Sequence, residues 1–211
     1  LNYNLNGNDT KVLKNINFEI KKNERVAIVG ESGSGKTSLL MIMSGLENPT
    51  SGTIIFKNLD LSKISEKKKT EIRKKKIGLI FQQFYLIPNY TALENVMFPM
   101  QINSIGNEKK KASTILSDSG LADRKNNLPF DLPGGEQQRV AIARAISFKP
   151  EIILADEPTG NLDKKNTELV SNLLLNYSKK KEIGLIIVTH NMNLAKKCDK
   201  IIKLIDGKVR L

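Results

Sequence analysis

One stretch decides the fold of this chain: Gly30-Glu31-Ser32-Gly33-Ser34-Gly35-Lys36-Thr37. It follows the apolar, β-branched run Arg25–Val29 and precedes a helical pattern over Lys36–Ser44, which Gly45 ends. Glycines allow the backbone to wrap closely around phosphate oxygens, and the N-terminus of a helix adds partial positive charge at that point. The pattern G-x-x-x-x-G-K-[ST], placed between a strand and a helix, therefore predicts binding of a nucleoside triphosphate.

The residue types in this loop indicate how the phosphates are held. We expect the ammonium group of Lys36 to reach the β- and γ-phosphates, and the hydroxyl of Thr37 to hold Mg²⁺. The predicted phosphate-binding residues are Gly30, Glu31, Ser32, Gly33, Ser34, Gly35, Lys36, Thr37 and Ser38.

A second acidic element follows much later in the chain. Four apolar residues, Ile152–Ala155, predict a buried strand, and Asp156 and Glu157 stand where it ends. Parallel sheets place ligands at the carboxyl ends of their strands, so both acids should face the phosphates. Successive side chains alternate along a strand and need not share a task. Asp156 suits a role linked to Mg²⁺, and Glu157 suits polarisation of the attacking water.

Short apolar runs alternate with helical patterns along the rest of the chain. Helical spacing is clear over Lys164–Lys179, and residues 84–146 lack a good strand and read as mainly helical. This alternation predicts an α/β fold with a largely parallel central sheet, in which 84–146 is an inserted helical subdomain of a single domain, 1–211. Shorter antiparallel strands are expected near the N-terminus, over Lys11–Ile20 and Gly52–Phe56. The other expected buried strands are Ile77–Phe81, Ile183–Thr189 and Ile201–Ile205.

Composition narrows the class of protein. A chain of 211 residues with 39% hydrophobic and 27% charged residues has the make-up of a folded globular protein. No apolar run approaches the roughly 20 residues needed to span a bilayer. No signal-peptide pattern opens the chain, and the single Cys198 has no partner for an internal disulfide, so we expect a cytosolic compartment. Because Leu1 is not Met, we expect a few residues to precede it.

The net charge of +12 raises the alternative of a polyanion-binding protein. The excess is mostly lysine, however, in short runs scattered beside polar or helical stretches. We interpret these runs as solvated faces and expect no specific nucleic-acid partner, although loose attraction to an anionic membrane surface stays open.

Further motifs give the chain a resemblance to the ATP-binding subunits of ABC transporters, nearly from end to end. The stretch Leu132–Val140 looks like the signature of that family and leads into the helical Ala141–Ile146. Pro158–Asp163 is similar to the family's D-loop, and Thr189-His190 ends a strand as the family's switch histidine does. Phe81-Gln82 resembles its Q-loop. Neither simple P-loop kinases nor GTPases have such a signature.

The resemblance implies a P-loop ATPase fold with a RecA-like core and a mechanism shared between two copies. ATP would lie between the phosphate loop of one copy and the signature residues Pro133, Gly134, Gly135 and Glu136 of the other, in a homodimer closed by ATP. Lys36 and Gly33–Thr37 would hold the phosphates. The metal ligands would be Thr37, Gln82 and Asp156, and the catalytic residues would be Glu157, His190, Lys36 and Gln82.

The resemblance also assigns two residues outside the motifs that hold the phosphates and the metal. Asp163 would communicate across the dimer, and Tyr3 would stack on adenine. For Tyr3 the alternative is an edge-strand aromatic that packs on the sheet. For the Q-loop glutamine the alternative to Gln82 is its neighbour Gln83.

An aromatic group surrounds Gln82. Its members Phe81, Phe84, Tyr85, Tyr90 and Phe98 occur together with Met97 and Met100. Two interpretations stay open: they form the core of the small subdomain, or some of them line the groove where family members receive a helix of the membrane subunit.

Two stretches, Thr91–Val96 and Leu154–Asp163, look like one subgroup of the family, which includes lipoprotein-releasing, macrolide- or peptide-exporting and cell-division ATPases. The first interpretation is lipoprotein release, and the alternative is export of antimicrobial peptides or macrolides. Both imply a separate integral membrane permease as partner and a peripheral position on the cytoplasmic face of the inner membrane. Soluble ABC ATPases acting on nucleic acid or ribosomes fit less well, because the chain lacks a second ATP motif and a zinc-type cysteine cluster.

One residue departs from the family pattern. Pro133 stands where the signature usually carries serine, whose hydroxyl would bond the γ-phosphate held by the other subunit. Proline is tolerated in the first turn of a helix but removes that hydroxyl. We therefore expect normal ATP binding by the monomer and weak ATP-driven dimerisation.

Overall fold

The centre of the fold is a parallel sheet. The computed structural model describes residues 1–5 and 8–210, and over these residues a six-stranded sheet has the order β10-β9-β3-β8-β7-β6. All neighbours pair in parallel except β10, which pairs antiparallel with β9 at one edge. The predicted α/β fold is confirmed. Its strands are β3 (Arg25–Val29), β6 (Ile77–Ile80), β7 (Ile152–Asp156), β8 (Gly184–Thr189), β9 (Lys200–Ile205) and β10 (Lys208–Arg210).

The central strands are apolar throughout because helices cover both faces of the sheet. In β7, Ile153 and Ala155 pack in a cluster with α5 and α6, whereas Leu154 packs in the cluster on the opposite face with α1. All three side chains are at most 1% exposed. A strand that is buried on both faces loses the polar alternation of a half-exposed strand, which is the pattern in the sequence.

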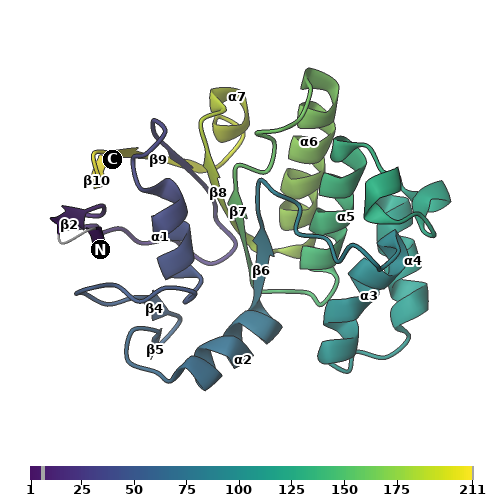
Figure 1. Cartoon of the computed structure of the whole chain (residues 1–211), viewed down its shortest axis with the longest axis horizontal. Coiled ribbons are helices and arrows are strands. Elements are labelled where there is room, and N and C mark those ends of the chain that lie inside the picture. The colour runs from purple at the N-terminus through teal and green to yellow at the C-terminus, as the bar shows by residue number, and fades with distance from the viewer. Residues whose placement is uncertain (6–7, 211) are drawn as a thin grey trace.

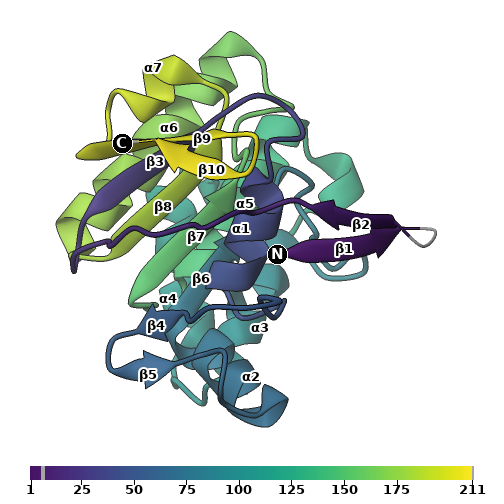
Figure 2. The same ribbon diagram turned by 90° about the vertical axis from the view of Figure 1, so that its left-hand side faces the viewer.

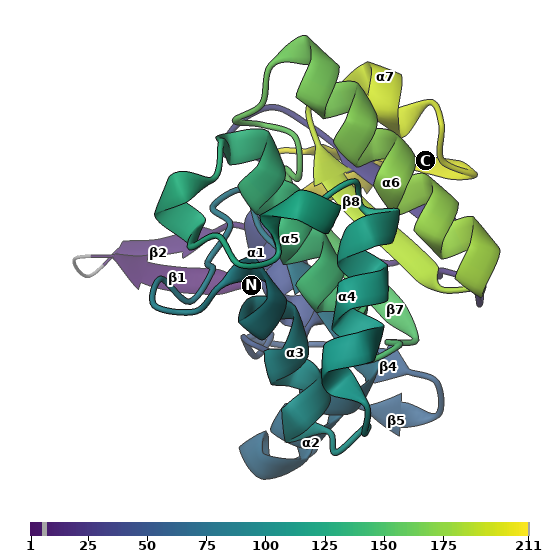
Figure 3. The same cartoon turned by 90° about the vertical axis from the view of Figure 1, so that its right-hand side faces the viewer.

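The helices form layers around this sheet (Figure 1). Helix α1 lies against one face, and α6 and α5 lie on the other, with α4 and α3 beyond them (Figure 3). Among the described residues, no helix combines the length and the apolar character needed to cross a membrane. The helices are α1 (Lys36–Met43), α2 (Glu66–Lys76), α3 (Ala92–Ile102), α4 (Glu108–Asp118), α5 (Gly134–Ile146), α6 (Lys164–Lys181) and α7 (Met192–Ala195).

Helices α3, α4 and α5, which come between β6 and β7 in the sequence, enclose a small core of their own. Met100, Leu116 and Val140, one from each helix, are fully buried in it. A capping box of Thr91 and Glu94 begins α3, which satisfies N–H groups of its first turn. Two short 3₁₀ turns, Ala122–Arg124 and Pro129–Asp131, connect α4 to α5.

The expected antiparallel part consists of two hairpins (Figure 2): β1 (Asn2–Leu5) with β2 (Asn8–Lys11), and β4 (Ile55–Phe56) with β5 (Leu59–Asp60). The predicted strand over Lys11–Ile20 is wrong beyond Lys11. Leu13, Ile16, Phe18 and Ile20 do pack in the cluster that faces α1, which explains their alternation. Asn15, however, has a φ of 50°, and this left-handed residue interrupts the extended backbone that a strand requires.

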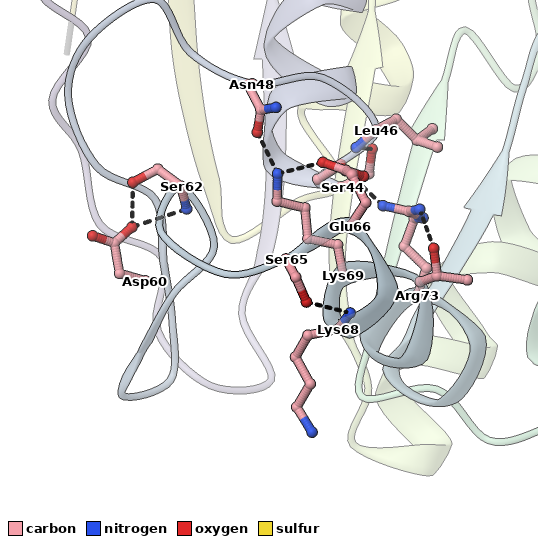
Figure 4. A network of polar contacts seen from close by, with 12 residues as sticks. Ser44, Leu46, Asn48, Asp60, Ser62, Ser65, Glu66, Lys68, Lys69 and Arg73 are labelled. Carbon is pink, nitrogen blue, oxygen red and sulfur yellow. Dashed lines mark hydrogen bonds and ion pairs between the residues drawn. The ribbon is translucent and has the colours of Figure 1, made fainter.

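Helix α2 is held to the core by polar contacts of long side chains (Figure 4). The Lys69 side chain is only 3% exposed, and its ammonium donates to Asn48 and, at 2.7 Å, to Glu66 Oε1. Arg73 Nη1 donates to the Gly45 carbonyl at 2.6 Å, beyond the end of α1. The inner side of this lysine-rich helix therefore combines these bonded polar groups with Ile72, which packs on the core cluster, and its other lysines are exposed.

Candidate nucleotide-binding site

The phosphate loop connects β3 to α1 and already contains a buried cation. Lys36 is 8% exposed, and its Nζ donates to the carbonyl oxygens of Gly30 at 3.0 Å and Glu31 at 2.8 Å. Gly35, with φ of 95°, forms the left-handed turn that begins α1. The loop thus curls around its own lysine, at the positive end of a helix.

Asp156 ends β7 beside this loop and is poorly solvated. Its side chain is 8% exposed, and its Oδ1 atom has no hydrogen-bond partner within the described residues. Burial raises the pKa of Asp156 above its ordinary value, while a hydrogen bond from Thr37 and the charge of Lys36 oppose the shift. A buried oxygen without a partner fits a ligand to a hard cation, which prefers carboxylate and hydroxyl oxygens.

Glu157 occupies a strained position directly after Asp156. Its φ is 43°, a left-handed value that costs of order 1–3 kcal/mol for a non-glycine residue. Three donors hold its carboxylate: the Thr189 hydroxyl at 3.2 Å, the His190 backbone N–H at 3.0 Å and the His190 Nδ1 at 2.9 Å. The ends of β7 and β8 therefore bring the predicted base and the predicted switch histidine into direct contact.

These groups share one cavity of about 500 Å³ at the carboxyl ends of the strands. Gln82 lines it and Gln83 does not, which favours the first of the two glutamines. Gly30, Glu31 and Ser34 belong to the loop without lining the cavity. The predicted residues that line it are Ser32, Gly33, Gly35, Lys36, Thr37, Ser38, Gln82, Asp156, Glu157 and His190.

The signature residues Pro133, Gly134, Gly135 and Glu136 do not line this cavity, and neither does Asp163. They begin α5, where Pro133 is the N-cap, and Asp163 caps α6. The two helix starts lie close together, since a Cβ added to Gly135 would lie 2.3 Å from the Asn166 side chain.

Asp163 and Tyr3, the other predicted residues, lie at a helix start and in the first hairpin. The Asn166 backbone N–H donates to Asp163 Oδ1 at 2.9 Å and holds the pKa of Asp163 below its usual range. Tyr3 pairs with Thr10 in the first hairpin, but its side chain lies outside the described part of the structure. One contact that sequence reasoning missed joins Gln82 to Asn161, and no spacing pattern marks it.

A larger cavity lies elsewhere. It measures about 970 Å³ between α1 and the segment that follows β2, and apolar side chains such as Ile16, Leu39 and Ile42 line part of it. No residue of the phosphate loop borders it, and neither Asp156 nor Glu157 does. We therefore place the chemistry in the smaller cavity, where charged groups converge.

Comparison with known proteins agrees with this geometry. A family model described as "ABC transporter" matches residues 13–160. The chain belongs to the ABC transporter family. It is an ATP-hydrolysing subunit of that family, and adenine nucleotide is its ligand.

Individual relatives match nearly the whole of this chain. The chain is 42% identical over 203 residues to the lipoprotein-releasing system ATP-binding protein LolD of Koribacter versatilis, covering 95% of this chain and 91% of that one. It is 43% identical to LolD of Syntrophus aciditrophicus, covering 96% and 92%.

Solved structures show the same fold. The dimeric structure of MJ0796, a bacterial ABC transporter cassette, superposes with a TM-score of 0.93 at 41% identity, over 100% of this chain and 93% of that one. A dimeric post-hydrolysis state of MJ0796 bound to ADP and Pi also gives 0.93, at 40% identity and the same coverage.

Pro133 allows a sharp test of the signature. We predict that Pro133→Ser raises ATP-driven dimerisation of this ABC ATPase by about 10- to 150-fold, the worth of one hydrogen bond to a charged group. Turnover should rise with it, and ATP affinity of the monomer should stay the same. Sedimentation velocity with ATP measures the dimer, and Pro133→Ala, which adds no hydroxyl, is the matched control. Equal dimerisation in the parent chain and both variants would show that the missing hydroxyl is neutral.

Proposed function

We propose that this ABC ATPase binds and hydrolyses ATP in the cavity at the ends of β3, β7 and β8, to release lipoproteins through a separate membrane subunit. The observation that carries the catalytic part is the convergence of Lys36, Asp156, Glu157 and His190 on that single cavity. The names of relatives at 42–43% identity support the choice of cargo.

We assign the phosphates to Gly33–Thr37. Backbone N–H groups of the loop and the α1 N-terminus bind the oxygens, and Lys36 supplies a full positive charge beside them. Tyr3, in the first hairpin, is proposed to stack on the adenine ring.

We assign Mg²⁺ to Thr37, Gln82 and Asp156, whose oxygen donors suit that ion. The metal would neutralise charge that develops on the phosphates during transfer. No group of three or more His, Cys, Asp or Glu residues that could hold a metal occurs in the described ranges, so the proposed site relies on phosphate and water ligands as well.

The strained carboxylate of Glu157 is the proposed general base. Three hydrogen bonds orient it, and a carboxylate held in this way can accept a proton from water. The His190 side chain is 69% exposed, and in the described contacts its ring is bonded only at Nδ1. The other ring nitrogen is proposed to contact the γ-phosphate.

The separation of the signature from the cavity supports a site made by two copies. We propose that Pro133, Gly134, Gly135 and Glu136 of one copy close over the nucleotide of the other, head to tail, and that Asp163 takes part in this interface. ATP binding would then favour the closed dimer and hydrolysis the open state. The MJ0796 structures, which are dimeric, support the association of two copies.

We also propose that residues 1–211 act as one ATP-binding domain, with 84–146 as the helical subdomain that meets the membrane subunit. The residues around Gln82 divide between a subdomain core and an exposed surface. Met100 is fully buried in the core, whereas Tyr85 is 62% and Phe98 is 36% exposed. Arg144 Nη2 donates to the Phe84 carbonyl at 3.0 Å, which fixes the segment that carries Tyr85. These exposed rings are the proposed docking surface for a permease at the cytoplasmic face of the inner membrane.

The role of Glu157 leads to a direct prediction. Glu157→Gln should slow ATP hydrolysis by about 10²- to 10⁴-fold, the usual worth of a general base. ATP affinity should be kept, and a dimer should accumulate with ATP because it cannot reopen by hydrolysis. Phosphate release and gel filtration measure the two effects, with Glu168→Gln, an exposed residue of α6, as the control. Turnover at the parent rate would refute the assignment of Glu157.

The cargo requires a separate experiment. Affinity-tagged chain should be purified from detergent-solubilised membranes of cells that express it at native levels. We expect a multi-span membrane protein and acylated lipoproteins to co-purify, and the Tyr85→Lys variant to lose both while keeping nucleotide binding. Recovery of ribosomes or nucleic acid instead, or of a permease that carries peptides or macrolides, would contradict lipoprotein release.

A further inference from the structure

Two amide side chains from distant parts of the chain meet at the edge of the nucleotide cavity. Gln82 follows β6, and Asn161 lies in the loop between β7 and α6. Gln82 Nε2 donates to Asn161 Oδ1 at 3.0 Å, and Asn161 Nδ2 donates to the backbone carbonyl of Gln82 at 3.4 Å. The pair joins the end of one strand to the loop that follows its neighbour.

The donors and acceptors of this pair fix which way each amide faces. The Gln82 carbonyl can only accept, so it selects the NH₂ group of Asn161. The oxygen of Asn161 then faces the Gln82 side chain, and an oxygen selects the NH₂ group there too. As a result Gln82 Nε2 is turned toward Asn161, and Oε1, on the other side of the same amide, is turned away from it.

Gly160 makes room for this arrangement. A Cβ added to Gly160 would lie 2.9 Å from Gln82 Nε2 and 3.3 Å from its Cδ. The Gly160 N–H donates to the Glu157 carbonyl at 3.0 Å, which ties the loop to the residue proposed as base. The Gln82 amide therefore occupies space that a side chain at position 160 would take, and Asn161 orients it.

We propose that Asn161 is a positioning residue that fixes the Gln82 amide so that Oε1, and not Nε2, is presented to the divalent cation. The inference rests on the proposed role of Gln82 as a metal ligand. An amide oxygen can coordinate a hard cation and an NH₂ group cannot. Without Asn161 the amide rotates, and only part of its population presents the oxygen.

The test measures metal binding directly. Mn²⁺ is titrated into the Glu157→Gln variant of the 211-residue chain with ATP, and free Mn²⁺ is followed by electron paramagnetic resonance. Asn161→Leu should weaken Mn²⁺ binding by about 2- to 12-fold, the factor that one neutral hydrogen bond is worth in an equilibrium. ATP affinity without metal should not change.

Further variants distinguish an error in the metal role of Gln82 from an error in the positioning role of Asn161. Gly160→Ala adds the Cβ that displaces the flexible Gln82 amide and should weaken Mn²⁺ binding as well, whereas Asn172→Leu, on α6, is a matched control. Gln82→Leu should weaken Mn²⁺ binding and abolish any further effect of Asn161→Leu. If Gln82→Leu leaves Mn²⁺ affinity unchanged, the metal role of Gln82 is wrong. If Gln82→Leu weakens it but Asn161→Leu does not, the positioning role alone is overturned.

Discussion

The site depends on a lysine ammonium held inside its own loop. Lys36 is almost buried, yet its partners are the neutral carbonyl oxygens of Gly30 and Glu31. A buried charge must be hydrogen-bonded, and carbonyls satisfy that need without cancelling the charge. The loop curls back toward the lysine at the start of α1. The ammonium makes no ion pair among the described residues, although it acts on nearby Asp156, so a positive charge remains at the cavity wall. A polyphosphate is the ligand that this charge fits.

The two acidic residues of the cavity differ in how they are solvated and bonded. Asp156 and Glu157 are adjacent, but the turn after β7 gives them unlike surroundings. Asp156 is desolvated and has an oxygen without a partner, whereas Glu157 receives three hydrogen bonds. Two carboxylates made unlike by their surroundings can divide metal binding from proton transfer. The strain at Glu157 is tolerated because Thr189, at the end of β8, and the following His190 hold its side chain in place.

The sequence predicted most of this fold because the strands are buried on both faces and therefore continuously apolar. It failed at residues 12–20, where alternation reflects packing against α1 and Asn15 breaks the strand. The site residues within a short motif could be predicted, since one turn fixes their spacing. The contact of Gln82 with Asn161 could not, because 79 positions separate the two residues and only the tertiary fold brings them together.

The most direct test of this account is calorimetry of ATP binding to Lys36→Ala. Loss of a charge-assisted contact should weaken binding by about 1.5–3 kcal/mol, or roughly 10- to 150-fold. Lys69→Ala removes another buried lysine, which is bonded to Asn48 and Glu66 far from the loop in sequence, and should leave ATP affinity unchanged. Equal ATP affinity in the parent and Lys36→Ala would contradict the claim that this buried ammonium organises the phosphate site.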